Sequence, residues 1–182
     1  EQGGRVSVAA VNGPSAVVLS GDADAVDAIA AHLAGRGVRT TRLRVGHAFH
    51  SAHMDGAAAT LADAVGPLAA ADARIPVVSD LTGAVAAPAD LTDPAHWARA
   101  LRGTVRFADG VRALRGLGVT RMVEIGPDAA LTPAALEVLA ADDGPDCLVV
   151  PTLRRERDEA VDLLAALGAL HAAGGCAIDW TA

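Results

Sequence analysis

The 182-residue sequence has no lysine and no tyrosine, and only two residues each of cysteine, methionine, tryptophan and phenylalanine. Cys147 and Cys176 lie far apart and form no C-x-x-C pair, so neither a disulfide framework nor a zinc ribbon is predicted. Free thiols of this kind favour a reducing, cytoplasmic location. No apolar run reaches the roughly 18 residues of a membrane-spanning helix and no signal peptide is recognised, so no membrane role is expected.

Positive charge is scarce as well. All fifteen basic residues are arginines, the net charge is −7, and the longest basic run is Arg154-Arg155. Without a basic patch or aromatic stacking platforms, nucleic-acid binding is not expected. Hydrophobic residues still make up 52% of the chain, enough for one domain or two subdomains with a core of Ala, Val, Leu and Ile. The chain opens at Glu1 without methionine, close to a predicted strand, which suggests a piece of a longer protein.

The first part of the chain predicts the order β-β-α-β. Two β-like runs, residues 6–11 and 16–20, flank a cluster of turn formers and indicate a hairpin. A helix is expected over residues 23–34, with capping oxygens in Ser20-Gly21-Asp22. The mixed alternation over residues 38–45 predicts a third, half-exposed strand. This order matches the latter part of a ferredoxin-like fold.

From residue 54 onward, helical patterns alternate with short strands, which is typical of an α/β fold with a mainly parallel sheet. The expected helices are residues 54–65, 95–102, 106–117, 131–139 and 158–173, and the expected strands are residues 75–79, 121–125 and 148–150. Trp97 is expected to face inward from its helix. The last helix is expected to bury an apolar stripe, which comprises Val161, Leu164, Leu167 and Leu170.

The stretch between these two parts brings three imidazoles together, those of His47, His50 and His53. It lies where a strand pattern gives way to a helical one, and connections of this kind often carry catalytic groups. In one interpretation, a histidine is the base for a Ser or Cys nucleophile elsewhere in the chain. In a second, the three histidines bind a metal, because they recur every three residues. In a third, two are solvated loop residues and one is a hydrogen-bonded core histidine.

Several short motifs follow one another along the chain. They are Val11-Asn12-Gly13-Pro14, Leu19-Ser20-Gly21-Asp22, His47-Ala48-Phe49-His50-Ser51, Trp97 with Arg102 and Val105-Arg106-Phe107, Val123-Glu124-Ile125-Gly126-Pro127, and Leu167-Gly168-Ala169-Leu170-His171 with Asp179-Trp180. Together and in this order they resemble the acyltransferase domain of a modular type I polyketide synthase, a relative of malonyl-CoA:ACP transacylases. The resemblance covers essentially the whole chain.

The resemblance implies an α/β fold with an α+β part. Residues 1–45 would form a partial ferredoxin-like small subdomain, residues 46–145 the C-terminal portion of an α/β-hydrolase-like large subdomain, and residues 146–182 the last strand and post-acyltransferase linker. His50 would be the general base of a Ser/His pair. The serine of this family lies in a G-H-S-x-G segment, which residues 1–182 do not contain. The chain alone is therefore expected to be inactive, with the nucleophile supplied from upstream.

The same resemblance implies further site residues. A backbone carbonyl near Asp90 is expected to accept a hydrogen bond from the second ring nitrogen of His50. His47 and Phe49 belong to an H-A-F-H signature that favours malonyl, because phenylalanine leaves less room near C2 of the extender than the serine of Y-A-S-H. Core packing is the alternative role for Phe49. Asn12 is expected either to line the acyl pocket or only to form a turn. No metal site is expected, since of the histidines only His50 inherits a role.

The implied reaction moves an extender unit, malonyl, from CoA to the upstream serine and then to the phosphopantetheine thiol of an acyl carrier protein. The chain itself is expected to bind no cofactor. Its expected partners are the carrier protein, the upstream remainder of the acyltransferase domain and a ketosynthase domain. The alternative is a non-catalytic α/β docking module of an assembly-line synthase, because these residues include no nucleophile.

Overall fold

The computed structural model describes residues 4–69, 73–175 and 179. The chain forms two compact units, Glu1–Gly110 and Val111–Ala182, and each is described by itself. The expected subdomain boundaries, after residues 45 and 145, refer to a complete domain and stay predictions.

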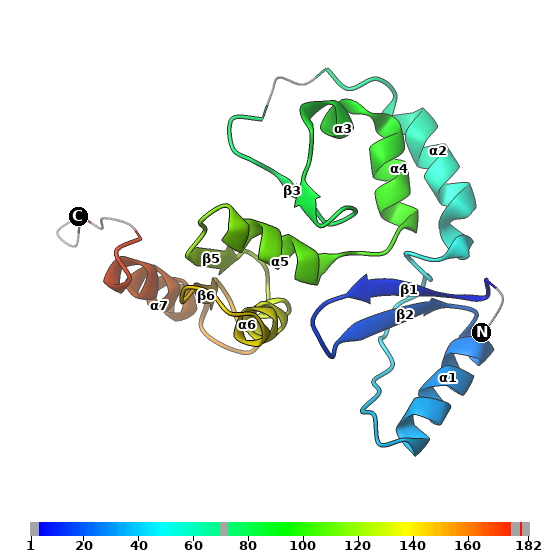
Figure 1. The fold of residues 1–182 in the computed structure, drawn as a ribbon, viewed down its shortest axis with the longest axis horizontal. Helices are drawn as coiled ribbons and strands as arrows, with labels where there is room; N and C mark the ends of the chain where they lie inside the picture. The colour runs from blue at the N-terminus through cyan, green and yellow to red at the C-terminus, as the bar shows by residue number, and fades with distance from the viewer. Residues whose placement is uncertain (1–3, 70–72, 176–178, 180–182) are drawn as a thin grey trace. The chain divides into compact units, whose positions relative to one another are not determined.

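The first unit contains short strands and helices (Figure 1). In chain order they are β1 (Val6–Val11), β2 (Val17–Gly21), α1 (Ala23–Gly35), the 3₁₀ turn η1 (Ala52–Met54), α2 (Asp55–Val65), β3 (Val78–Ser79), β4 (Ala84–Val85), α3 (Pro88–Thr92) and α4 (Pro94–Arg102). The residue boundary between the units falls within α5 (Phe107–Gly116). The second unit continues with β5 (Arg121–Glu124), α6 (Thr132–Ala141), β6 (Leu148–Pro151) and α7 (Glu159–Ala172).

The predicted hairpin and the helix after it are confirmed. β1 and β2 pair antiparallel, with Val6 opposite Gly21 and Val11 opposite Val17. Gly21 has a φ of 151°, and a side chain there would overlap the backbone carbonyl of Arg5, so only glycine allows this close approach. α1 follows directly, which places the residue at its N-terminus, Asp22, beside the start of β1.

The strand predicted over residues 38–45 is wrong. These residues have no regular structure and are exposed, including Val38, Leu43 and Val45. An isolated strand leaves its backbone N–H and C=O groups without partners, and no strand within the described ranges lies alongside this segment to form a ladder. The first unit therefore shows the order β-β-α, without the last strand expected for the ferredoxin-like part.

The helices around the histidine-rich stretch are confirmed. α2 packs against α4 (Figure 1). α4 begins as predicted, because Pro94 occupies its first turn and the Asp93 side chain accepts a hydrogen bond of 2.9 Å from the Ala95 N–H. The inward-facing residue of α4, however, is His96 and not Trp97, which is 40% exposed. The strand expected over residues 75–79 is formed only at Val78–Ser79.

The second unit confirms the parallel pairing that strand and helix alternation predicted. β5 and β6 pair parallel from Arg121 opposite Leu148 to Glu124 opposite Pro151, with α6 between them in sequence. The inward stripe predicted for α7 is wrong. Val161 and Leu164 are 57% and 60% exposed. The buried residues of α7 are Asp162 and Ala166, which are four residues apart and therefore share a face.

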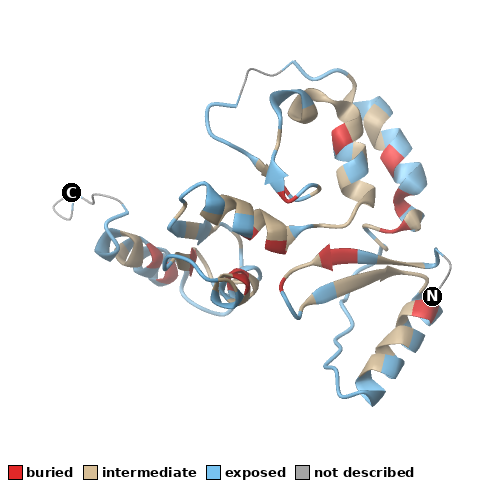
Figure 2. Cartoon of the chain, in the orientation of Figure 1, coloured by how far each residue is buried: buried red, intermediate tan, exposed pale blue. Residues whose placement is uncertain are grey.

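Small side chains dominate the buried positions of both units, as the composition predicts. Figure 2 shows where the buried residues lie along the chain. The buried hydrophobic residues are Ala9, Ala10, Ala25, Met54, Ala58 and Ala108 in the first unit, and Val111, Ala135, Val138, Val150 and Ala166 in the second. Within the part of the chain that the structure describes, no helix is both long and apolar enough to cross a membrane.

Candidate active site

His50 lies between the irregular segment 36–49 and η1, and its backbone is in an unusual conformation. Its φ is 60°, in the left-handed region that residues other than glycine rarely adopt. Such a conformation persists only where surrounding contacts hold it, and these positions concentrate at functional sites. One contact is direct, because the His50 N–H donates a hydrogen bond of 3.2 Å to the carbonyl of Leu101 at the end of α4.

The imidazole of His50 is fixed by the same end of α4. Its Nδ1 lies 2.8 Å from the backbone carbonyl oxygen of Gly103, 53 residues along the chain. A carbonyl only accepts, so Nδ1 must carry the proton in this bond, and in the neutral ring Nε2 then has a free lone pair. No other hydrogen bond joins the His50 ring to a described residue. The ring is therefore oriented as a base that receives a proton at Nε2.

The expectation that a carbonyl near Asp90 accepts the hydrogen bond from His50 is wrong, because the acceptor is the carbonyl of Gly103. Asp90 lies in α3, where its carboxylate accepts a hydrogen bond of 3.1 Å from the Ala87 N–H. Gly103 instead follows the last residue of α4. The final carbonyls of a helix have no partner within the helix, so those of Leu101 and Gly103 are available to bind a neighbouring segment. The acceptor was expected before α4, whereas it lies after that helix.

The hairpin holds the Gly103 carbonyl in place through the two residues that follow it. The Thr104 hydroxyl donates to the carbonyl of Val8 at 2.7 Å. The Val105 N–H donates to the carbonyl of Ala9 at 2.8 Å, and the Val105 carbonyl accepts from the Val11 N–H at 2.9 Å. Residues 103–105 are thus tied to β1, so the hydrogen-bond partner of His50 belongs to a fixed part of the first unit.

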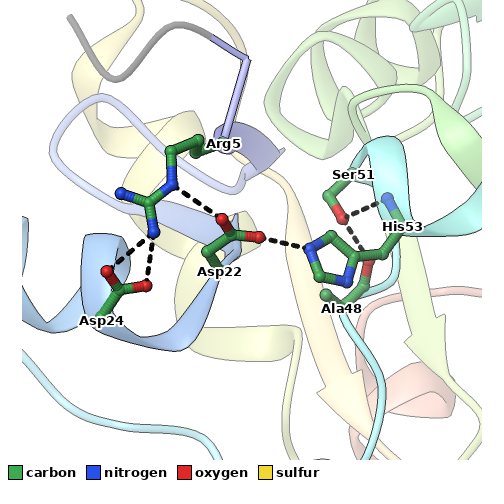
Figure 3. Close-up of polar contacts among 6 residues, drawn as sticks. All are labelled: Arg5, Asp22, Asp24, Ala48, Ser51 and His53. Carbon is green, nitrogen blue, oxygen red and sulfur yellow. Dashed lines mark hydrogen bonds and ion pairs between the residues drawn. The ribbon is translucent and has the colours of Figure 1, made fainter.

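Ser51 shapes the turn that carries His50. Its side chain is buried, with 1% of the residue exposed. The hydroxyl donates to the carbonyl of Ala48 at 2.6 Å and accepts from the His53 N–H at 3.3 Å, which caps η1 (Figure 3). These two bonds close residues 48–53 into a compact turn around His50.

The three histidines do not share a site. The ring of His47 meets that of Phe49 edge to face, with centroids 6.0 Å apart. The ring of His50 binds Gly103, and Nε2 of His53 lies 2.7 Å from the Asp22 carboxylate. Among the described residues, no three His, Cys, Asp or Glu side chains are grouped as metal ligands. The three imidazoles therefore lie in separate environments.

The two residues expected to contact substrate lie in different settings. Phe49 is 46% exposed, directly before His50, so it is not part of the core of this unit. Asn12 is half-buried in the hairpin loop, where its N–H donates to the Ala16 carbonyl at 2.9 Å. That bond fits a turn-forming role for Asn12. The substrate contacts of Asn12, His47 and Phe49 stay predictions.

Charged residues next to the turn were not predicted as part of the site. Asp22 was expected to cap α1, but its side chain makes no capping hydrogen bond. Its carboxylate instead binds Arg5, at 2.8 Å from Nε, and His53 (Figure 3). These hydrogen bonds, first that of Arg5 and then that of His53, lower the pKa of Asp22. On the other side, Arg102 binds Asp55 at 2.6 Å and so joins the end of α4 to the start of α2.

Comparison with known proteins identifies the fold and family. A family model for the acyl transferase domain matches residues 2–176. The chain belongs to this family. Polyketide synthase GfsA from Streptomyces halstedii is 45% identical over 179 residues, which cover 98% of this chain and 2% of that protein. The chain thus spans only a small part of the length of this polyketide synthase.

Solved structures agree with this assignment. The acyltransferase domain from the second module of the salinomycin polyketide synthase is 43% identical, with a TM-score of 0.83 over 98% of this chain and 40% of that one. A malonyl-CoA:acyl carrier protein transacylase from Xanthomonas oryzae is 30% identical, with a TM-score of 0.75 over 90% of this chain and 49% of that one. The chain thus spans about half or less of these solved acyltransferases.

Proposed function

We propose that this chain carries the general base of a polyketide synthase acyltransferase, and that this base is His50. The observation that supports the proposal most directly is the Nδ1 hydrogen bond to Gly103, which directs the lone pair of Nε2 away from the helix end. Family membership supplies the reaction class, acyl transfer. The serine nucleophile would come from a G-H-S-x-G segment outside these residues.

In the first half-reaction, Nε2 of His50 takes the proton of the serine hydroxyl as its oxygen attacks the thioester carbon. The tetrahedral intermediate then collapses, the carbon–sulfur bond breaks, and the departing CoA thiolate takes the proton from Nε2. In the second half-reaction, the carrier-protein thiol loses its proton to Nε2 and attacks the acyl-serine. The serine oxygen leaves and recovers that proton. The carbonyls of Leu101 and Gly103 at the C-terminus of α4 stabilise the imidazolium formed in each half.

The proposed acyl group is malonyl. His47-Ala48-Phe49-His50 provides an exposed aromatic ring next to the base, and the edge-to-face contact with His47 restrains that ring. A ring at this position would leave little room for a branch at C2 of the extender. A single methyl group changes binding in a pocket by about 1–3 kcal/mol, so Phe49 would set a preference and not an absolute exclusion. The proposed acceptor is the phosphopantetheine thiol of an acyl carrier protein.

The proposal is tested with a complete domain, made by joining residues 1–182 to the preceding segment of the salinomycin second-module acyltransferase. This domain should transfer malonyl from CoA to a carrier protein, and the intact mass of the carrier protein should rise by the mass of the malonyl group. Residues 1–182 alone should form no acyl-enzyme. Transfer by the complete domain that His50→Ala leaves unchanged would contradict the role of His50. Stoichiometric acylation of the chain alone would show that it contains its own nucleophile.

A further inference from the structure

His53 is an exposed residue that the reaction proposed above does not use, yet it makes one of the shortest polar contacts of the first unit. Its Nε2 lies 2.7 Å from Oδ1 of Asp22. It also follows His50 by three residues, within the turn that Ser51 closes. We propose that His53 is a positioning residue for His50, acting through its hydrogen bond to Asp22. This inference rests on the proposed function of His50.

His50 needs support from outside its own segment. Its backbone has a φ of 60°, and residues 36–49 before it have no regular structure. A strained conformation is kept only when surrounding contacts over-determine it. The contacts from α4, through Leu101 and Gly103, hold His50 from one direction. A second anchor is needed to fix the direction in which the ring points.

Asp22 is itself firmly held. Its N–H donates to the carbonyl of Arg5 at 2.9 Å, and its Oδ2 accepts from Nε of the same arginine at 2.8 Å. Arg5 also binds the Asp24 carboxylate through NH2 at 2.6 Å and 2.7 Å. The carboxylate that binds His53 is therefore attached to Arg5, directly before β1, and through Arg5 to Asp24 in the first turn of α1 (Figure 3).

Ser51 joins the two anchors. Its hydroxyl accepts a hydrogen bond from the His53 N–H and donates one to the Ala48 carbonyl, so a displacement of His53 is passed on to both sides of His50. With both anchors in place, the turn is held between the end of α4 and the start of α1. Without the Asp22 contact, only the α4 side remains, and the His50 ring gains freedom to leave its bond with Gly103.

This contact should affect rate more than stability. The side chains of His53 and Asp22 are 49% and 34% exposed, and exposed ion pairs contribute little to folding. Misplacing a catalytic group by about an ångström, in contrast, can reduce a rate by about a hundredfold. A residue that only stabilised the fold would show the opposite pattern, with a lower melting temperature and an unchanged ring of His50.

The test measures the tautomer of His50 directly. In the 182-residue chain labelled with ¹⁵N-histidine, the shifts of the His50 ring nitrogens should report one tautomer, protonated at Nδ1. His53→Ala should produce a mixture of tautomers with little change in melting temperature. His53→Gln, whose side-chain amide can donate to Asp22, should keep the single tautomer. His32→Ala is the matched control, because it removes an exposed histidine at the far end of α1.

The complete domain adds a kinetic readout. His53→Ala should lower kcat about tenfold with KM unchanged, and His53→Gln should recover most of that loss. Asp22→Ala removes the same hydrogen bond from the other side, so the effects of the two alanine variants should not add. Should His53→Ala fail to fold, Asp22→Ala takes its place in both measurements. Loss of fold in both variants would overturn the proposal, because the contact would then hold the fold and not the base.

The two proposals fail in different ways. An unchanged tautomer and rate in His53→Ala, together with an inactive His50→Ala domain, would overturn the positioning role and leave His50 as the base. A fully active His50→Ala domain would overturn the proposed function, whatever the spectra show. Additive effects of His53→Ala and Asp22→Ala would also overturn the positioning role, since the two residues would then act separately.

Discussion

Two junctions that lead into helices, one in each unit, use a polar side chain in opposite ways. Before α6, the Glu124 carboxylate accepts four hydrogen bonds, from the N–H groups of Ala130, Leu131 and Thr132 and from the Thr132 hydroxyl, at 2.7–2.9 Å. Before η1 and α2, the ring of His50 makes a single hydrogen bond to the part of the chain that the structure describes. Glu124 ends a regular strand, whereas His50 has a left-handed backbone.

The difference separates a structural group from a chemical one. Glu124 uses its oxygens to bind the N–H groups of Ala130 and Leu131, directly before α6, and that of Thr132, the first residue of α6. The N–H groups at the start of a helix have no partner within the helix. In His50, the hydrogen bond of Nδ1 orients the ring, and Nε2 remains available to accept a proton. The left-handed backbone of His50 is strained, and strained residues of this kind concentrate at functional sites. Replacing His50 by an inert side chain should therefore lower the rate of transfer, and replacing Glu124 should lower the stability of the fold.

The largest effect is expected from His50→Ala in the complete domain. General-base assistance contributes about 10²–10⁴ to a rate, so kcat/KM for malonyl transfer should fall by that factor. The melting temperature should change little, because the ring is only partly buried and makes one hydrogen bond. His32→Ala removes an exposed histidine in α1 that has no part in the proposed site, so this control should transfer malonyl at the rate of the unmodified domain. A loss of the same size in His32→Ala would show that the lower rate is not specific to His50.

Gly103→Ala should disturb the same junction from the side of the acceptor. A Cβ at Gly103 would lie 2.7 Å from Cδ1 of Leu81 and 2.9 Å from the carbonyl oxygen of Arg99. The leucine tip can move, but the helix carbonyl cannot, so the Gly103 carbonyl must shift away from His50. Overpacking of this kind costs about 1–3 kcal/mol of stability, and the rate should fall with it.

A matched glycine in the other unit provides the control for that variant. Gly168 lies inside α7, and a Cβ there would meet nothing within 4 Å. Gly168→Ala should therefore raise stability by up to about 1 kcal/mol without changing the rate. Thermal unfolding and transfer kinetics of both variants give the comparison. A Gly103→Ala domain with unaltered rate would show that the position of this carbonyl is not critical.

Replacing His47-Ala48-Phe49 by Tyr-Ala-Ser should change selectivity at the His50 junction. The aromatic ring beside the base becomes a hydroxymethyl group, which opens space for a methyl branch at C2. Because a methyl group is worth about 1–3 kcal/mol, the preference for malonyl over methylmalonyl should fall roughly ten- to a hundredfold. The measurement is competition between the two CoA thioesters, expressed as a ratio of kcat/KM values. An unchanged ratio would show that residues other than Phe49 determine the selectivity.

The smallest effect is expected at the other junction, from Glu124→Gln. Desolvation raises the pKa of Glu124, but the hydrogen bonds from Thr132, Leu131 and Ala130 outweigh it, so the pKa lies below its ordinary value. A carboxyl with a lowered pKa in the folded state stabilises the fold above its unfolded pKa, about 4.3. That contribution is lost as the pH falls through the lower folded pKa.

Glu124→Gln should therefore lower the free energy of unfolding by about 1 kcal/mol at neutral pH, as for other lost helix caps. The difference from the unmodified chain should shrink as the pH falls below about 4.3. Urea unfolding of the chain between neutral pH and pH 3 measures both the loss of unfolding free energy at neutral pH and its decrease toward acid pH. Glu137→Gln, within α6, is the matched control for removing a carboxylate from the same unit. A difference that grows toward acid pH would contradict the capping role.

Local patterns in the sequence predicted much of this fold. The hairpin, α1, α2, α4, α5 and the parallel pair β5 and β6 all follow from apolar periodicity, turn formers and caps within a few residues of each element. His50 was singled out by its neighbours in the sequence and by the resemblance to acyltransferases. For the helices and strands, the deciding information lay within one short stretch, whereas the role expected of His50 came from a resemblance that covers essentially the whole chain.

The wrong predictions concern features that depend on contacts with residues far away in the sequence. Residues 38–45 have some strand character, but a strand requires a neighbour with which to pair. In α7, either face could have been buried, and the contact with β6 selected the face of Asp162. The acceptor of His50 lies 53 residues away, and Asp22 lies 31 residues before His53. Sequence spacing cannot supply such pairings without the tertiary structure.

Chemical rescue tests the role of His50 most directly. His50→Gly removes the ring, and glycine tolerates the φ of 60° at this position. In the complete domain, we expect this variant to be nearly inactive in malonyl transfer and to regain activity in proportion to the concentration of added neutral imidazole, with no such response from His47→Gly. Activity of His50→Gly that is already near that of the unmodified domain, or a folded variant that imidazole does not rescue, would contradict the account.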